Sequence, residues 1–538
     1  MESRDYWARA SQIARDVLGF AAVRPAQQEA AAALAAGHDC LAVLPSGAGK
    51  SAIYQIAAIA LGGTAVVVSP LLALQRDQAG ALRRRGLTAV TVNAVSGQSA
   101  RDAAAQLLGS GQTGFIFLGP EQLARQDVTA MLARAAVRLL AVDEAHCISS
   151  WGYDFRPDYL RLGSVIDSFA TRPAVAALTA TAAPPVRQEI VARLGLKHPR
   201  QVIRDFDRPE IHLAVRSFHR ARDKETAVVA AVREQAGSGL IYTATRRQAE
   251  TYAALLGVPK YHGGLATAER LAAQRAFEDG ATIVATSAFG MGIDRADVRF
   301  VVHASVAGSL DEYYQEIGRC GRDGQAAAAI CCYRAEDLGL QRHFASGLPT
   351  EAELAAVAGA AAAPITRREL AARTGLPPLR LAELLNLLEA AGAVRLGSCV
   401  EPADNPPPAA EAAARALEVA KHHRSVERSR VEMMRLYAEM TDCRRRFLLR
   451  YFGEAVSDPC GHCDNCEAGQ SRADVRGGVF SPGERVQHQE WGPGLVLAAE
   501  DDRLTVLFDE YGYRELATDV VSGRHLLTPA WGKHAPGT

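Results

Sequence analysis

The 538-residue sequence is poor in several features, and each absence excludes a class of protein. No apolar run approaches the roughly 18 residues of a membrane-spanning helix, which argues against an integral membrane protein. The first ten residues, MESRDYWARA, are charged and lack an apolar core, so we expect no signal peptide. Ten cysteines in so long a chain do not suggest a disulfide scaffold. We therefore expect a cytoplasmic protein of roughly three or four domains.

The chain also has no net charge and few lysines. The 60 basic and 60 acidic residues cancel, which alone argues mildly against a nucleic-acid-binding protein. The charge is uneven, however, with a net +5 over residues 421–450 and a net −4 over residues 481–538. These two segments predict one surface for phosphates and another for a basic partner. Lysine occurs at only six positions, so Lys50, inside a glycine-rich loop, is more informative than usual.

Apolar runs alternate with helical stretches in the first two thirds of the chain. In residues 1–205 these runs are TAVVVSP, TGFIFLGPE, RLLAVDEAH and AVAALTATA, and in residues 206–345 they are GLIYTAT, TIVATSA, VRFVVHAS and AAAICCY. Short buried strands separated by helices are typical of βαβ units. The sequence predicts two tandem α/β lobes with parallel sheets, and ligand chemistry at the carboxyl ends of their strands.

The remaining third changes character. Residues 346–400 predict a helix-turn-helix or small winged helix, with a helical spacer as the alternative. The proline-rich segment 401–411 indicates a linker. Residues 412–470 predict a basic helical module that ends in a cysteine cluster, and residues 481–530 predict a small β-barrel of short alternating strands.

The segment LPSGAGKS (44–51) follows an apolar run and predicts a phosphate-binding loop. Its glycines let backbone N–H groups close on a phosphate, and the helix that follows offers its positive end. Lys50 would contact the β- and γ-phosphates of ATP, and Ser51 would bind Mg²⁺. The match is incomplete, because Leu44 stands where the strict pattern has glycine. The predicted nucleotide-binding residues are Ser46, Gly47, Gly49, Lys50 and Ser51.

Two further segments predict ATP hydrolysis. Asp143 and Glu144 end the apolar run LLAV, where Asp143 could hold Mg²⁺ and Glu144 could orient and deprotonate the attacking water. Phosphoryl transfer also needs positive charge at the transition state, and QEIGRCGRDG (315–324) supplies Arg319 and Arg322. If the two lobes face each other, these arginines reach the γ-phosphate across the cleft. The alternative is a Gly-Arg loop that binds a structural carboxylate.

Taken together, the P-loop, DEAH, ATSAFGMGID (285–294) and QEIGRCGRDG segments resemble a superfamily 2 helicase. DEAHCISSWGYDFRPDY (143–159) narrows the resemblance to the RecQ family of DNA helicases. The resemblance covers residues 18–340 and resumes over 425–466. It implies two RecA-like lobes, ATP-driven 3′→5′ translocation, DNA unwinding in recombination and repair, and association with the nucleoid.

The resemblance also implies roles for individual residues. LGFAAVRPAQQEA (18–30) is similar to the family's adenine-reading segment, with Gln27 as the base contact and Arg24 beside it. The loop after DEAH is similar to an aromatic-rich loop that senses single-stranded DNA through Trp151, Phe155 and Arg156. Aromatic faces stack on any base, which fits such a role without sequence readout.

Three cysteines at CxxCxxC spacing and one 17 residues upstream resemble the zinc module of RecQ proteins. Four thiolates would make a closed tetrahedral Zn²⁺ site that contributes to folding. An iron–sulfur cluster, or His462 in place of one cysteine, are the alternatives. We also expect Arg444, Arg445 and Arg446 to contact duplex phosphates. The predicted zinc ligands are Cys443, Cys460, Cys463 and Cys466.

The segments VQHQEWGPGLV and LTVLFDEYGYREL resemble the small C-terminal barrel of UvrD-type helicases, which is associated with RNA polymerase. The resemblance implies a protein partner, and a capping barrel without a partner is the alternative. The helix-turn-helix-like segment precedes the zinc module, whereas RecQ chains usually carry their winged helix after it. Two other functions stay open: a DNA-tethered adaptor that recruits a protein through the barrel, and an RNA helicase.

Overall fold

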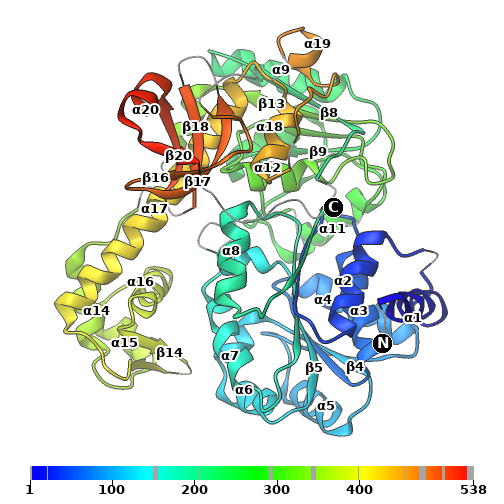
Figure 1. Cartoon of the computed structure of the whole chain (residues 1–538), viewed down its shortest axis with the longest axis vertical. Coiled ribbons are helices and arrows are strands. Elements are labelled where there is room, and N and C mark those ends of the chain that lie inside the picture. Colours follow the sequence, from blue (N-terminus) through cyan, green and yellow to red (C-terminus); the bar gives the residue numbers. More distant parts are fainter. Residues whose placement is uncertain are drawn as a thin grey trace.

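The computed structural model describes residues 3–20, 22–149, 156–204, 206–289, 295–340, 347–397, 399–454, 456–471, 480–499, 503–509 and 511–529. Two α/β lobes lie one above the other, and a long helix carries a small helical domain away from them (Figure 1). A zinc-module-like segment and a small antiparallel sheet complete the molecule. This arrangement agrees with the fold class predicted from the sequence.

The first lobe is built on a seven-stranded, fully parallel sheet in the order β3-β4-β2-β5-β6-β1-β7. Strands β1, β2, β4 and β6 are buried along their whole length, as their continuous apolar sequences require, and β5 is buried except at Arg138. The strands are β1 (Cys40–Val43), β2 (Thr64–Val68), β3 (Thr88–Val92), β4 (Gly114–Leu118), β5 (Val137–Val142), β6 (Ala174–Thr179) and β7 (Arg200–Ile203). The helices are α1 (Ser3–Asp16), α2 (Pro25–Ala35), α3 (Lys50–Leu61), α4 (Leu72–Arg84), α5 (Gln98–Ser110), α6 (Gln126–Ala133), α7 (Leu162–Ser168) and α8 (Pro184–Arg193), with short 3₁₀ turns η1 (Pro120–Ala124), η2 (Ala145–Ile148) and η3 (Pro157–Arg161).

The second lobe repeats this plan with a six-stranded parallel sheet in the order β10-β11-β9-β12-β13-β8. All four strands predicted for this lobe are present. The strands are β8 (Ile211–Ser217), β9 (Gly239–Tyr242), β10 (Lys260–Tyr261), β11 (Ile283–Ala285), β12 (Phe300–His303) and β13 (Ala327–Tyr333). The helices are α9 (Ala221–Arg233), α10 (Arg246–Leu256), α11 (Thr267–Glu278) and α12 (Leu310–Ile317), and η4 (Ala335–Asp337) follows β13.

A winged-helix arrangement follows the second lobe. Helices α14 (Glu351–Ala360), α15 (Arg367–Thr374) and α16 (Pro378–Ala390) precede the hairpin β14 (Val394–Leu396) and β15 (Val400–Pro402). Ile365 bridges to Val400 and adds a third short edge to that hairpin. Thr350 and Thr366 cap their helices through capping boxes, so the sequence itself marks where α14 and α15 begin.

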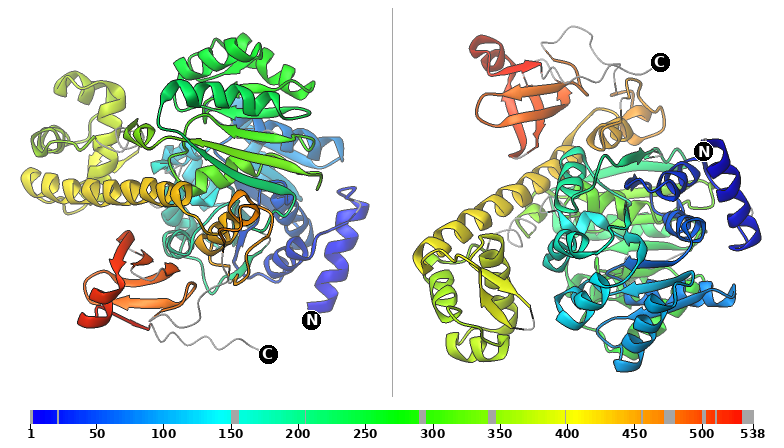
Figure 2. Two further views of the ribbon diagram at one scale, coloured as in Figure 1. Left: turned by 90° about the horizontal axis from the view of Figure 1, so that it is seen from above. Right: turned by 60° about the horizontal axis from the view of Figure 1, so that its bottom comes forward.

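The long helix α17 (Ala409–Glu439) spans about 46 Å at 1.5 Å per residue. Its N-terminal half, including Ala412, Ala416 and Ala420, completes the core of the winged-helix domain. Its C-terminal half, including Met434 and Tyr437, packs into the core shared by the lobes. The expected linker over 401–411 is therefore shorter than its proline content suggests, because β15 extends to Pro402 and the helix starts at Ala409. One rigid element thus connects the winged-helix domain to the motor lobes (Figure 2).

The cysteine-rich module consists of α18 (Arg444–Tyr451), α19 (Asp464–Glu467) and the loop between them. It packs against β8 of the second lobe, where Leu213 bridges to Cys463 and the Val215 N–H donates to Asp464 at 2.7 Å. The Phe452 ring stacks on Phe206, in the segment that joins the lobes, with ring centroids 4.8 Å apart. The cysteine-rich module therefore packs against both β8 and the segment that joins the two lobes.

The C-terminal domain is a five-stranded antiparallel sheet in the order β19-β18-β17-β16-β20. Alternation along the strands buries both faces: Val506 and Phe508 enter the domain's own core, whereas Leu507 packs into the core shared with the lobes. The Tyr513 N–H donates to the buried Ser429 hydroxyl of α17 at 2.5 Å, so the domain is docked on that helix. Its elements are β16 (Arg485–His488), β17 (Gly492–Ala499), β18 (Arg503–Phe508), β19 (Gly512–Ala517), α20 (Thr518–Arg524) and β20 (Leu527–Pro529).

Among the helices that the structure describes, none combines the length and apolar character that crossing a membrane requires.

Candidate nucleotide and metal sites

The glycine-rich loop lies between β1 and α3, at the carboxyl edge of the first sheet. Gly47 and Gly49 have φ angles of 79° and 70°, a left-handed backbone that other residues adopt only with strain. Lys50 is the first residue of α3, and its ammonium donates to the carbonyls of Leu44 at 3.1 Å and Pro45 at 3.3 Å. Burial lowers the pKa of Lys50, and the carboxylates of Glu144 and Asp143 oppose that effect. Hydrogen bonds to two backbone carbonyls thus hold the lysine ammonium against the loop.

The predicted adenine-reading residues lie directly beside this loop. Gln27, in the first turn of α2, donates from Nε2 to the carbonyls of Ala48 at 2.6 Å and Gly49 at 3.1 Å. Its Oε1 accepts from the Arg24 backbone N–H at 2.9 Å, which closes the start of the helix. Nε2 lies 2.5 Å from the position that a Cβ on Gly49 would occupy, so a larger residue there would displace the glutamine. Gln27 therefore senses the conformation of the phosphate-binding loop.

Asp143 and Glu144 follow β5, two strands away from β1 in the sheet. The Ser69 hydroxyl, at the end of β2, donates to Asp143 Oδ2 at 3.1 Å, and the Asp143 N–H donates to the Val68 carbonyl at 2.9 Å. Burial and the neighbouring Glu144 raise the pKa of Asp143, whereas Lys50 and the Ser69 hydrogen bond lower it. The three charged groups of Lys50, Asp143 and Glu144 therefore share one poorly solvated site.

Glu144 has a φ of 49°, one of three non-glycine residues with positive φ in the described part of the chain. This conformation costs of order 1 kcal/mol and is retained where the surroundings impose it. The buried His146 lies beside this residue, with its Nδ1 3.3 Å from Glu144 Oε2 and 2.9 Å from Thr179 Oγ1 at the end of β6. The carboxylate of Glu144 thus lies close to a histidine that is hydrogen-bonded to the neighbouring strand.

Arg322 brings the second lobe to the phosphate-binding loop. Its Cδ lies 3.3 Å from the position that a Cβ on Gly47 would occupy, so its side chain lies against the loop backbone. The positive charge of Arg322 also lowers the pKa of Lys50, which places the two cations in one electrostatic environment. The lobes therefore face each other across the nucleotide site.

Arg319 is buried within the second lobe, only 6% exposed, beside Tyr242 and Glu316. Burial raises the pKa of Glu316 to about 8, and the Arg319 guanidinium opposes this shift. Within the described residues, Arg319 Nε has no hydrogen-bond partner. A buried guanidinium donor without an acceptor is costly.

The DNA-sensing loop can be placed only in part. Trp151 and Phe155, together with residues 290–294 of the ATSAFGMGID segment, lie outside the described residues. Arg156 is described and half-buried, and its N–H donates to the Cys147 carbonyl at 2.9 Å. The Tyr159 hydroxyl, shortly after the loop, donates to the Asp143 carbonyl at 2.9 Å. The end of the predicted DNA loop is thus bonded to the predicted metal-binding residue.

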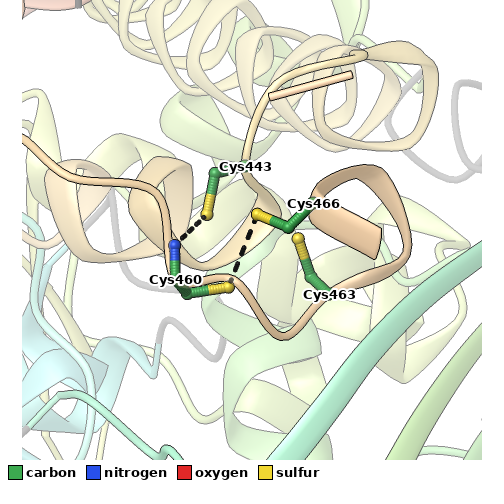
Figure 3. A group of neighbouring side chains, drawn as sticks. All are labelled: Cys443, Cys460, Cys463 and Cys466. Atoms are coloured by element: carbon green, nitrogen blue, oxygen red, sulfur yellow. Dashed lines mark hydrogen bonds between the residues drawn. The ribbon is translucent and has the colours of Figure 1, made fainter. Parts of the chain in front are cut away.

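The four predicted zinc ligands converge on one point (Figure 3). The Sγ atoms of Cys443, Cys460, Cys463 and Cys466 all lie within 4.8 Å of one another. Tetrahedral Zn²⁺ with bonds of about 2.3 Å needs sulfur atoms roughly 3.8 Å apart, and the Cys460 and Cys466 Sγ atoms are 3.9 Å apart. Hydrogen bonds from the Cys460 and Cys463 thiols hold the pKa of Cys443 well below its usual value. The cluster therefore fits a structural zinc ion.

His462 does not belong to this cluster. Its ring is exposed, with Nδ1 3.9 Å from a Glu467 carboxylate oxygen, and it meets the His212 ring edge-on at 5.1 Å. The alternative in which His462 replaces a cysteine is therefore wrong in this structure.

The prediction that Arg444, Arg445 and Arg446 contact DNA phosphates is also wrong. All three side chains are buried, at 4%, 8% and 2% exposure. They form ion pairs with Asp464, Asp207 and Asp442 at 2.5, 3.3 and 2.5 Å, respectively. A buried guanidinium needs partners for its donors, and each of these three side chains also donates to a backbone carbonyl. Arg445 thus binds the module to the start of the second lobe, whereas Arg444 and Arg446 hold the module together and fix it to α17.

Sequence reasoning did not single out two residues that complete the nucleotide site. Ser69 binds Asp143, and Thr179 binds His146. Both lie in segments that resemble helicase motifs, SPLLALQRDQ and LTATA, so the signal was present in the sequence. The sequence did not indicate which of these residues bind each other, because only the sheet order brings the ends of β2, β5 and β6 together.

Three protein-family models match the chain. They are described as DEAD/DEAH box helicase over residues 24–190, helicase conserved C-terminal domain over 223–324, and RecQ zinc-binding over 410–467. The last match assigns the cysteine cluster to zinc rather than to an iron–sulfur centre. The first two cover the two lobes that meet at Lys50 and Arg322.

Curated relatives agree over most of the chain. The ATP-dependent DNA helicase RecQ of Haemophilus influenzae is 32% identical over 464 residues, which cover 85% of this chain and 63% of that protein. RecQ of Bacillus subtilis is 30% identical over 480 residues, which cover 87% of this chain and 68% of that protein. This chain thus spans less than two thirds of the Haemophilus protein. Among solved structures, the DUF1998 helicase MrfA bound to DNA has a similar fold, with a TM-score of 0.52 at 16% identity over 76% of this chain and 64% of that chain.

The family models match both lobes and the segment with the four-cysteine cluster. The RecQ relatives match over the same parts of the chain. The chain belongs to the RecQ family.

Proposed function

We propose that the protein is an ATP-dependent 3′→5′ DNA helicase that couples ATP hydrolysis to translocation on single-stranded DNA and to duplex unwinding in recombination and repair. The observation that carries the proposal is the position of Arg322 from the second lobe on the glycine-rich loop of the first. A site completed by both lobes makes hydrolysis depend on how the lobes close. Binding of a DNA strand across the lobes can therefore control hydrolysis.

Each side chain has a role in this proposal. The backbone of Ser46, Gly47 and Gly49 and the ammonium of Lys50 would bind the phosphates of ATP, and Ser51 and Asp143 would hold Mg²⁺, which would neutralise phosphate charge. Glu144 accepts a proton from the attacking water, and His146 keeps its carboxylate in place. Arg322 and the unsatisfied donor of Arg319 stabilise negative charge that develops on the γ-phosphate.

Nucleotide binding would also release Gln27 from the loop. In the present arrangement Gln27 donates to the loop carbonyls of Ala48 and Gly49. When its amide pairs with an adenine base, with Arg24 beside it, these contacts are exchanged for contacts with the ligand. The loop would then open only for the correct base.

DNA contact is proposed to reach the site through the segment 147–159. Trp151, Phe155 and Arg156 would bind the strand, and the bond from Tyr159 to Asp143 connects the end of this segment to the metal-binding carboxylate. This route explains how an empty DNA site could leave the carboxylate misplaced for catalysis.

The proposal is tested by strand displacement and ATPase assays with the full chain. We expect unwinding of duplexes with a 3′ tail and none with a 5′ tail, and stronger stimulation of the ATPase by DNA than by RNA. Stimulation by RNA alone would favour the RNA helicase. DNA stimulation without displacement of any strand would favour a translocating adaptor.

A finer part of the proposal concerns the C-terminal sheet, which would recruit a protein such as RNA polymerase to the helicase at the nucleoid. Support comes from its likeness to UvrD-type barrels and from its docking on α17, which would hold a partner close to the lobes. Removal of residues 481–538 should abolish capture of purified RNA polymerase and leave the DNA-stimulated ATPase in place. Equal capture by the truncated chain would exclude the barrel as the contact.

A further inference from the structure

A cleft of about 350 Å³ lies where the C-terminal sheet meets α17, outside the nucleotide and zinc sites. It is formed by one face of the helix, by β19 of the sheet and by the first described residues of the winged-helix domain. Its lining residues are Leu348, Lys421, Arg424, Ser425, Arg428, Ser429, Glu432, Tyr513 and Arg514.

The cleft has an excess of positive charge because of helical periodicity. Lys421, Arg424 and Arg428 recur at intervals of three and four residues, so they share one face of α17. Arg514 adds a fourth cation from β19. The only carboxylate among the lining residues is that of Glu432, which is already bound by Arg435 at 2.8 Å.

Three of these cations have no acidic partner in the part of the chain that the structure describes. Arg424 and Arg428 form no ion pair there, and Arg424 Nε is buried without an acceptor. Arg514 donates to the Tyr513 carbonyl at 2.8 Å and lies 5.8 Å above the Trp491 ring. Lys421 differs, since its ammonium is 2.6 Å from Glu418.

Four other arginines of the basic segment 421–450 do have acidic partners. Arg444, Arg445 and Arg446 are buried against carboxylates, and Arg435 is paired with Glu432 and Glu439. Like charges that converge without a partner destabilise a surface by mutual repulsion. Their retention on both walls of one cleft is typical of a site for an anion with several charges.

The position of the cleft indicates which anion. Leu348 and Arg424 also line a larger groove of about 1420 Å³, which runs between the winged-helix domain and the first lobe. On the first lobe this groove begins at Leu160 and Arg161, only a few residues after the predicted DNA-sensing loop. The groove therefore connects the first lobe to the cleft. Its own lining contains six glutamates and four arginines, so the positive excess that attracts phosphates is confined to the cleft.

We infer that the cleft between α17 and the C-terminal sheet is a second DNA-binding site, in which Arg424, Arg428 and Arg514 bind the phosphodiester backbone. The inference rests on the proposed function, because it takes DNA as the substrate of the lobes. It gives the docked C-terminal sheet a role in holding the strand as well as in any contact with a protein.

The test measures DNA affinity against salt concentration with the full chain. The double variant Arg428→Ala/Arg514→Ala should lower the slope of log affinity against log salt by about 1.4 for a single-stranded oligonucleotide and about 1.8 for a duplex. At 0.1 M salt this corresponds to a loss of affinity on the order of tenfold or more. The salt slope is compared with that of the unmodified protein for each DNA. The cleft holds the form, single strand or duplex, whose slope falls by the larger fraction.

Two control variants make the result decisive. Arg222→Ala/Arg233→Ala removes two exposed arginines of α9 that have no ion pair in the described chain, and it should leave the slope unchanged. Arg428→Lys/Arg514→Lys keeps the charge and should restore most of the affinity. A slope equal to that of the unmodified protein in the alanine variant overturns the inference and leaves the cleft to a ligand such as an acidic peptide. Equal losses in the alanine and lysine variants also overturn it, because charge would then not be the cause.

The ATPase at saturating DNA separates this inference from the proposed function. Stimulation by DNA should persist in the alanine variant, since no residue of the cleft contacts the nucleotide site. An unmodified protein whose ATPase ignores DNA would refute the helicase, whereas the salt slope would still report on the cleft.

Discussion

The nucleotide site and the helix α18 of the zinc module are both dense in charge, yet they treat it in opposite ways. In the nucleotide site Lys50 donates to two carbonyls, Asp143 accepts from one hydroxyl and one backbone N–H, and Arg319 Nε has no acceptor among the described residues. In α18 each of three successive arginines is buried in an ion pair and completed by a backbone carbonyl. A charged side chain that is available to a ligand differs from one that is already neutralised only in its ion-pair and hydrogen-bond partners.

This comparison teaches how to interpret a run of basic residues. The composition of α18 suggested a phosphate-binding surface, but Arg445 is used to fix the module to β8 and to the segment that joins the lobes, and Arg444 and Arg446 are bonded within the module and to α17. Within the described residues, the cleft cations without an acidic partner lie on α17 and on β19. A basic sequence therefore predicts the sign of the potential, whereas the ion-pair partners decide whether that potential is available to DNA.

The largest expected effect concerns the metal that supports α18. The variant Cys463→Ser, or chelation of the unmodified protein, should destabilise the module by several kcal/mol, because structural zinc in small modules contributes on the order of 10 kcal/mol to folding. Thermal unfolding and released zinc measure this. Cys399→Ser is the matched control, since Cys399 is a partly exposed thiol outside the cluster. An unchanged unfolding curve after complete removal of the zinc would contradict a structural role.

The next effect belongs to the nucleotide site. Glu144→Gln should lower kcat of the DNA-stimulated ATPase by about 10³-fold, because it removes the proton acceptor and keeps the shape. ATP affinity, measured by titration with a non-hydrolysable analogue, should stay within a few-fold. Glu225→Gln, an exposed position on α9, serves as the control. Normal turnover in Glu144→Gln would sink the assignment of the base.

A third variant sharpens the comparison directly. Arg444→Ala should reduce the unfolding free energy by about 3 kcal/mol, because it leaves the Asp464 carboxylate without its buried partner. DNA affinity of the folded protein should not change. Denaturant unfolding and DNA titration give the two numbers. Weaker DNA binding at unchanged stability would restore the phosphate-binding role that the structure excludes.

The smallest effect is a pH dependence next to Arg319. Burial raises the pKa of Glu316 to about 8 and lowers that of His303 to about 4, and the two side chains lie 2.8 Å apart. A carboxyl whose pKa is raised on folding stabilises the fold at low pH and loses that contribution as pH rises through 8. His303, with a lowered pKa, acts in the opposite direction only below about pH 6.5.

Between pH 6.5 and 8 the unfolding free energy should therefore fall by at most about 2 kcal/mol through Glu316. Denaturant unfolding across this range, compared with Glu316→Gln, isolates the contribution. The variant should show a flatter profile in the same window. Parallel profiles for the two proteins would mean that Glu316 stays ionised throughout.

Much of the site could be predicted from the chain itself. Lys50 and Glu144 stand at the ends of apolar runs, and the carboxyl ends of parallel strands meet at one edge of a sheet, so local pattern is sufficient to group them. The spacing of the four cysteines likewise predicted that their thiols bind one metal centre. The prediction of a helix-turn-helix or small winged helix over residues 346–400 followed from two helical stretches separated by a turn with Gly375.

Other features could not be predicted, because they depend on partners far away in the sequence. The pairing of Arg445 with Asp207 joins residues 238 positions apart, and nothing local distinguishes it from an exposed arginine. The same holds for Arg322 against Gly47 and for Thr179 against His146.

The sequence alone determined which residues are chemically able to act, since glycine, lysine, carboxylate and thiol each carry their chemistry with them. Only the tertiary structure decided which charges are neutralised within the chain and which remain for a ligand. The physical reason is that the free energy of a buried charge depends on the groups within a few ångströms of it, and folding brings those groups from distant segments.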